Sequence, residues 1–193
     1  SIPYFKDSGG VNAIINVKNI MTSLYSENGF YKEAQKERNE ALELAKKKKH
    51  YLFLSQIYFN YSVELRKRGL LKKRVKYIDS ALINVEHSRY KTYYKPIYLA
   101  GAVIAWSELN NVSNAKTYMD MLEKEARKNA PGETTAFYKD AKMRFAFAKK
   151  DYNLALKYGK EYYQYNVEIK QFEGLESANR FLAKVYTAFG NDK

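Results

Sequence analysis

Cysteine is absent from the sequence, which excludes disulfides, a thiolate nucleophile and a zinc site of the cysteine type. Only three prolines and nine glycines occur in 193 residues, few for a chain of many short strands and tight turns. No apolar run reaches the roughly 18 residues of a membrane span, and no charged leader with an apolar core opens the sequence. These absences favour an all-α chain without covalent cross-links.

Acidic residues are also scarce beside basic ones, with 21 Asp and Glu against 34 Lys and Arg and a formal charge of +13. A strongly basic domain can bind nucleic acid, anionic lipid or acidic protein. The cations are spread along the whole chain, however, as expected where Lys solvates the outer faces of packed helices. We therefore favour solvation as the explanation and keep nucleic acid as an alternative.

The most prominent feature that the sequence does contain is an internal repeat, first visible in residues 24–42 and recurring through to the end of the sequence. Its turn position falls at Gly29, Gly69, Asn110, Lys150 and Gly190, at intervals of 40, 41, 40 and 40 residues. A fixed period between about 20 and 50 residues is typical of solenoids built from stacked supersecondary units.

Between the turns, apolar residues recur every three or four positions, as Ile14, Val17 and Met21 do, which predicts amphipathic helices. We expect a lead-in over 1–10 followed by one all-α domain over 11–193, built as an α-solenoid of about nine helices. The predicted hairpins and terminal helix cover residues 11–47, 50–88, 92–128, 133–170 and 173–189.

The repeat resembles the tetratricopeptide family, whose unit is a helical hairpin with large and aromatic residues in its first helix and alanines in its second. The matching segments are residues 21–25 and 182–186 in first helices, and 29–34 and 150–155 at turns. Lys142 and Arg74 depart from this pattern at positions where the family has core residues. The resemblance covers about residues 11–190 and implies a right-handed superhelix.

The period of about 40 exceeds the 34 residues of the commonest tetratricopeptide form and is similar to that of arrays in bacterial sensor kinases and transcription regulators. The resemblance therefore implies a non-enzymatic scaffold or sensory part of a larger signalling protein. Its compartment is open between the bacterial periplasm, as part of a membrane-anchored regulator, and the cytoplasm. Because Ser1 is no initiator and the pattern asks for another helix after Gly190, we expect the sequence to be an excerpt.

Residue types that carry catalysis or bind metals form no recognisable constellation. His50 and His87 stand 37 residues apart without metal-site spacing, and no serine lies in a GxSxG turn. Glu37, Glu40 and Glu43 are spaced as a solvated helix face rather than as a pair in a cleft that would shift their pKa values. We therefore expect no enzyme activity, no metal and no cofactor.

What remains is the groove that the resemblance implies, lined in the family by first-helix residues that are not used for packing. Carried over by register, these positions grade from amide-rich through apolar to basic. They are Asn16, Asn19, Ser23, Gln56, Phe59, Asn60, Val63, Ile97, Ile104, Arg144, Arg180 and Lys184.

An extended peptide fits this gradient. Asn side chains both donate to and accept from a peptide backbone, the apolar middle can seat side chains, and the basic residues can take a carboxylate. Protein or peptide binding is thus the favoured function. The alternatives are a basic nucleic-acid-binding array and a dimerisation module that pairs through an apolar face of the ninth helix.

Overall fold

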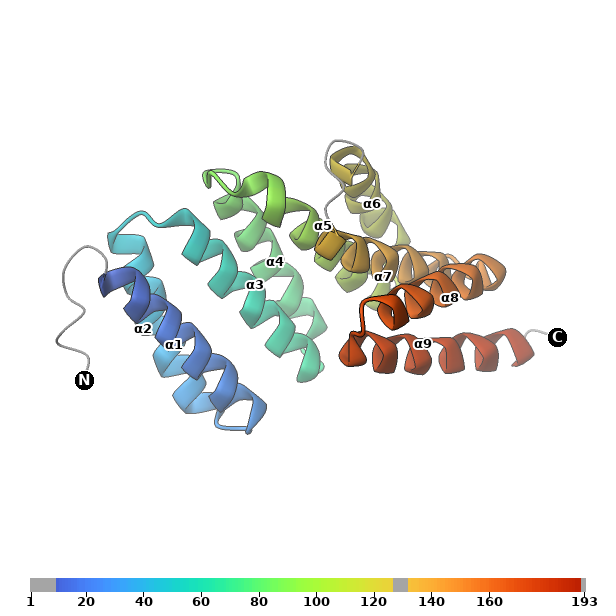
Figure 1. The fold of residues 1–193 in the computed structure, drawn as a ribbon, viewed down its shortest axis with the longest axis horizontal. Coiled ribbons are helices and arrows are strands. Elements are labelled where there is room, and N and C mark those ends of the chain that lie inside the picture. The colour runs from blue at the N-terminus through green and yellow to red at the C-terminus, as the bar shows by residue number, and fades with distance from the viewer. Residues whose placement is uncertain (1–9, 127–131, 192–193) are drawn as a thin grey trace. The chain divides into compact units, whose positions relative to one another are not determined.

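The computed structural model describes residues 10–126 and 132–191, and all regular secondary structure in these ranges is α-helical (Figure 1). The all-α prediction is confirmed, and the predicted limits of the hairpins and terminal helix lie within three residues of observed helix ends, except the limit at 128, which falls outside the described residues. The predicted lead-in falls outside the described residues except Gly10. The helices are α1 (Gly10–Glu27), α2 (Tyr31–Lys47), α3 (Tyr51–Lys67), α4 (Leu71–Val85), α5 (Lys91–Glu108), α6 (Val112–Ala126), α7 (Gly132–Ala148), α8 (Tyr152–Glu168) and α9 (Phe172–Asn191).

The predicted turn positions end helices through a left-handed residue. Gly29, Gly69, Asn110 and Lys150 all have φ between 55° and 81°. At Gly29 the Phe30 amide donates to the carbonyl of Tyr25 at 2.8 Å, a closure that satisfies orphan carbonyls at the helix end. Gly190 differs, because α9 continues through it to Asn191.

Two further turns of this kind join successive hairpins. Lys49 and Lys170 have φ of 51° and 55°, and the residues after them close the same hydrogen bond, His50 to Ala45 at 2.8 Å and Gln171 to Asn166 at 2.9 Å. Turns within a hairpin and between hairpins therefore share one geometry. The structural repeat in these parts of the chain is a helix and a turn, about half the length of the sequence repeat.

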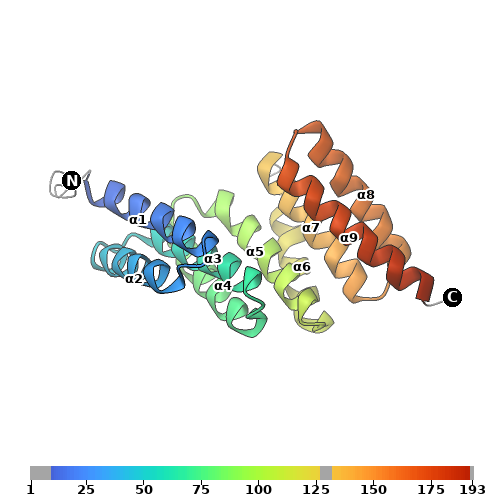
Figure 2. The same cartoon turned by 90° about the horizontal axis from the view of Figure 1, so that it is seen from below.

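The chain forms two compact units, Ser1–Lys91 and Thr92–Lys193, and each is described by itself. In the first unit α1 pairs with α2, α3 pairs with α4, and α2 packs on α3 (Figures 1 and 2). The α2–α3 core joins small Ala41 and Ala45 to large Phe53 and Ile57. The small side chains let the two helices approach closely, and α1 also adjoins α3.

In the second unit α7 pairs with α8, and α9 packs on both (Figure 2). Their core joins Met143, Ala155, Phe181 and Val185. The α8–α9 approach requires a glycine, since a Cβ on Gly174 would lie 1.8 Å from Oδ1 of buried Asn166. Helix α5 is apolar all round, and each of residues 96–105 is buried.

The two departures from the repeat pattern are accommodated differently. Arg74 is buried at 3% exposure on α4. Lys142 is half-buried, and its Nζ lies 4.0 Å from the ring centre of Tyr158 and 5.4 Å from that of Tyr138, so aromatic faces stabilise the ammonium group.

Candidate functional site

A hollow of about 60 Å³ lies between α1 and α3, with room for a few water molecules or the end of one side chain. Four of the predicted groove residues, Asn19, Ser23, Asn60 and Val63, lie in its wall. The complete lining is Asn19, Thr22, Ser23, Ser26, Glu27, Ile57, Asn60, Tyr61, Val63, Glu64 and Lys67.

The hollow exists because the facing positions of α1 carry short polar side chains. Asn19, Thr22, Ser23 and Ser26 recur at helical spacing along one side of α1. None is long enough to fill the space opposite α3, where Ile57 supplies a buried apolar floor.

An amide pair crosses the hollow. Asn60 Nδ2 on α3 donates to Asn19 Oδ1 on α1 at 3.3 Å, and neither side chain has another hydrogen-bond partner among the described residues. Asn19 therefore keeps a free NH₂ and Asn60 a free carbonyl. Reversing both amides exchanges the two roles but still leaves one donor and one acceptor facing outward.

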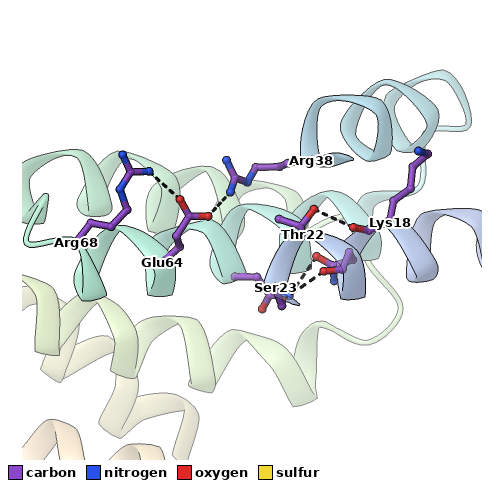
Figure 3. Close-up of polar contacts among 8 residues, drawn as sticks. Lys18, Thr22, Ser23, Arg38, Glu64 and Arg68 are labelled. Atoms are coloured by element: carbon purple, nitrogen blue, oxygen red, sulfur yellow. Dashed lines mark hydrogen bonds and ion pairs between the residues drawn. The ribbon is translucent and has the colours of Figure 1, made fainter. Parts of the chain in front are cut away.

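The hydroxyl groups beside this pair donate hydrogen bonds to backbone carbonyls of α1. Thr22 Oγ1 donates to the Lys18 carbonyl at 2.8 Å and Ser23 Oγ donates to the Asn19 carbonyl at 3.3 Å (Figure 3). Their oxygens keep lone pairs that can accept from a ligand. The α1 wall thus offers acceptors next to the amide donor.

A buried ion-pair network closes the wall on the α2 side of α3. Glu64 accepts from Arg38 of α2 and, at 2.9 Å, from Arg68 (Figure 3). The Arg38 guanidinium also stacks 3.6 Å from the ring centre of Tyr61. Burial lowers the pKa of Arg38, an effect that the charge of Glu64 opposes. Because both Glu64 oxygens are engaged, this carboxylate holds α2 to α3 rather than acting as a free acid or base.

The rim carries a looser pair. Glu27 of α1 and Lys67 of α3 lie 3.5 Å apart, between Oε1 and Nζ, and both side chains are more than half exposed. An exposed pair of this kind contributes little to stability. It is easily exchanged for a contact with a ligand, so the rim does not seal the hollow.

Three other predicted groove residues of the first unit, Asn16, Gln56 and Phe59, do not contribute to the described lining. Asn16 is exposed on α1, whereas Gln56 and Phe59 are half-buried on α3. Their roles toward a ligand stay predictions.

The predicted groove residues of the second unit are placed differently. Ile97 and Ile104 are buried, at 8% and 3% exposure. Arg180 is exposed and pairs with Glu176 at 2.5 Å. Lys184 lies 4.9 Å from the ring centre of Phe147.

Arg144, predicted to receive a ligand carboxylate, is engaged within the second unit. Its Nε donates to Asp140 at 2.6 Å, its Nη2 donates to Ser177 of α9 at 3.2 Å, and its Nη1 lies 3.7 Å from Glu108 of α5. Burial opposes the charge of Arg144, but the two carboxylates outweigh it and raise the pKa of Arg144. The side chain joins α5, α7 and α9 instead of projecting freely.

Exposed apolar residues gather on α1 rather than on α9. Val17, Ile20 and Leu24 are each more than half exposed on the side of α1 opposite Ile15. On α9 the outer face is largely polar, and its large exposed apolar residues are Phe172 and Tyr186. The dimerisation hypothesis, which expects an apolar ninth helix, gains no support from this distribution.

The described residues contain no helix long and apolar enough to cross a membrane. Within the same ranges, no group of three or more His, Asp or Glu side chains is placed to hold a metal ion. The sequence matches no protein-family model, and it matches no curated protein. The helices and their pairwise packing show an all-α array of helical hairpins. Because no family model matches, the tetratricopeptide family stands as a resemblance.

Proposed function

We propose that the chain is a non-enzymatic module that binds an extended segment of a peptide or protein at the hollow between α1 and α3. The observation that carries this proposal is the Asn19–Asn60 pair, which leaves one amide donor and one carbonyl acceptor at the surface. An extended backbone presents the complementary carbonyl and N–H groups at every residue.

The rest of the lining suits the same ligand. Ile57 and Val63 offer an apolar floor for one side chain, and the hydroxyl oxygens of Thr22 and Ser23 accept further N–H groups. The small volume favours a narrow, extended ligand that lies along the surface over a compact small molecule enclosed in a cavity.

The larger context comes from the sequence alone. The resemblance to long-period tetratricopeptide arrays supports a sensory or scaffolding role in a larger bacterial regulatory protein. In such a role the occupied groove would report the presence of a partner segment to an effector domain of the full protein.

Selection of displayed random peptides on the intact chain tests this function. We expect binders whose affinity falls at least tenfold in Ser23→Trp, because the indole ring fills the hollow. Asn39→Trp, which alters an exposed position of α2, is the matched control and should keep the affinity. Unchanged binding by a folded Ser23→Trp chain would place the peptide site elsewhere.

A further inference from the structure

One end of the first unit carries a concentrated set of cations and aromatic rings. It is formed where α2 leads into α3 and where α4 ends (Figure 1). The two connections touch, since the rings of Tyr51 and His87 lie 5.0 Å apart. We call this surface the basic aromatic patch; it comprises Lys46, Lys47, Lys48, Lys49, Tyr51, His87, Arg89, Tyr90 and Lys91.

The six cations of the patch are exposed, and none has an ion-pair partner among the described residues. At the opposite end of the same unit the arrangement differs, because Lys67 pairs with Glu27 at 3.5 Å and Arg68 pairs with Glu64 at 2.9 Å. Cations at one end of the first unit are thus partly neutralised by ion pairs, whereas the six cations of the patch form none among the described residues.

Helix stability explains only part of this charge. Lys46 and Lys47 lie in the last turn of α2, where the helix dipole favours cations. Lys91 is the first residue of α5, where the dipole disfavours a cation, and Arg89 precedes it. A run of four consecutive lysines also repels itself, so the patch is better suited to an anionic partner than to stabilising the fold.

The exposed aromatic rings of the patch favour an anionic partner that also carries planar groups. Tyr51 and Tyr90 remain 37% and 44% exposed, and the Arg89 guanidinium lies 4.8 Å from the ring centre of Tyr90. Planar faces beside a row of cations match the two features of a nucleic-acid strand, stackable bases and a phosphate backbone.

We propose that the basic aromatic patch binds single-stranded nucleic acid, with its lysines on the phosphates and Tyr51 and Tyr90 against the bases. Double-stranded nucleic acid hides its base faces, and an anionic lipid surface has none, so neither makes use of the exposed rings. Binding of this kind is tolerant of sequence, because every base has a π-face.

Fluorescence anisotropy with a fluorescein-labelled 20-nucleotide oligo(dT) tests the proposal on the intact chain. We expect a dissociation constant in the micromolar range at 50 mM NaCl and a steep weakening with salt. The triple variant Lys47→Gln, Lys48→Gln, Arg89→Gln should bind at least tenfold more weakly. Its slope of log K against log salt should be shallower by about 2, at about 0.7 per lost phosphate contact.

The matched control removes equal charge from the second unit, at exposed positions with no ion-pair partner among the described residues: Lys124→Gln, Lys157→Gln, Lys160→Gln. It should bind as the unmodified chain does. Tyr90→Ala should weaken binding several-fold while leaving the salt slope unchanged, because it removes stacking and no charge.

Three results would overturn the proposal. The first is no oligonucleotide binding at 50 mM NaCl. The second is an equal loss in the patch variant and the control, which would make net charge alone responsible. The third is patch-dependent binding to vesicles containing phosphatidylserine without any binding of oligo(dT), which would assign the surface to lipid.

Discussion

The contact between α1 and α3 and the contact between α7 and α9 occupy the same place in the repeat but are filled differently. Asn19 and Ser23 of α1 have Asp140 and Arg144 as their counterparts on α7, ten and six residues before the turn. The short polar side chains leave a hollow, whereas Arg144 reaches across to Ser177 of α9 at 3.2 Å. Side-chain length at two register positions thus distinguishes a contact with a hollow from a contact that an arginine side chain bridges.

The helices behind these contacts show a second exchange. In the first unit small Ala45 of α2 meets large Phe53 of α3. In the second unit the corresponding residues are Asn166 of α8 and Gly174 of α9, and the larger side chain belongs to the preceding helix. The larger side chain of the pair therefore stands on α3 in the first unit and on α8 in the second.

The largest effect is expected from Gly174→Ala. Its Cβ would lie 1.8 Å from Asn166 Oδ1, so α8 and α9 must separate or the buried Asn must lose its hydrogen bond to Tyr162. We expect a loss of about 3 kcal/mol in the free energy of unfolding, measured by urea denaturation. Gly190→Ala, which meets nothing within 4 Å, should be neutral or slightly stabilising, and an equal loss there would refute the close-approach argument.

Removing the Arg144 bridge should have the next largest effect. Arg144→Met leaves the buried Asp140 carboxylate without its ion pair, and we expect a loss of about 2 kcal/mol in urea unfolding, reduced for partial exposure. Adding Asp140→Asn to Arg144→Met should recover part of that loss, since the more deeply buried of the two carboxylates that face Arg144 is then uncharged. No recovery would show that packing, and not charge, is what Arg144 supplies.

Changing the amide pair should separate stability from binding. In Asn19→Ala with Asn60→Ala, we expect the free energy of unfolding to change by less than about 0.5 kcal/mol, because the hydrogen bond is exposed. The dissociation constant of a selected peptide should rise at least tenfold. A large loss of stability would instead show that the Asn19–Asn60 pair is a structural contact, as the Arg144–Ser177 contact between α7 and α9 is.

The smallest effect concerns acid stability of the first unit. Lys18 of α1 bonds to Glu37 at 2.8 Å and to Glu40 at 2.5 Å, and the hydrogen bond from Lys18 lowers the pKa of Glu40 below its usual 4.5. The stabilisation from Glu40 is therefore complete above pH 4.5 and is lost as the pH falls through the lowered pKa.

Melting temperatures between pH 2 and pH 6 measure this contribution. Glu40→Gln should flatten the decline below pH 4.5, whereas Glu43→Gln should leave it unchanged, because Glu43 is an exposed residue of the same helix with no described partner. Identical pH profiles for Glu40→Gln and the unmodified chain would contradict the role of the Lys18 contact.

Features set by local chemistry could be predicted from the sequence, and features set by distant packing could not. Gly29 and Gly69 predict the turns at their positions, because glycine readily adopts positive φ. Lys49 and Lys170 adopt the same conformation without such a signal. Helix boundaries followed from apolar periodicity, but the pairing of Arg38 with Glu64, 26 residues apart, depends on how α2 lies against α3.

The candidate site shows the same division. The tetratricopeptide resemblance, carried over by register, predicts a common groove for Asn19, Ser23, Asn60 and Val63, and the structure brings these four residues together around one hollow. The engagement of Arg144 had a local signal, since Asp140 stands one helical turn before it. The burial of Ile97 likewise had a signal in the nearly continuous apolar run of α5, which a register argument ignores.

The most direct test of the account follows side-chain NMR signals of the ¹⁵N-labelled intact chain during titration with a selected peptide. We expect shifts in the NH₂ signals of Asn19 and Asn60, with the Arg144 Nε–H signal unmoved because that group is already bonded to Asp140. Unmoved Asn signals together with a shift at Arg144 would contradict it and place the binding surface in the second unit.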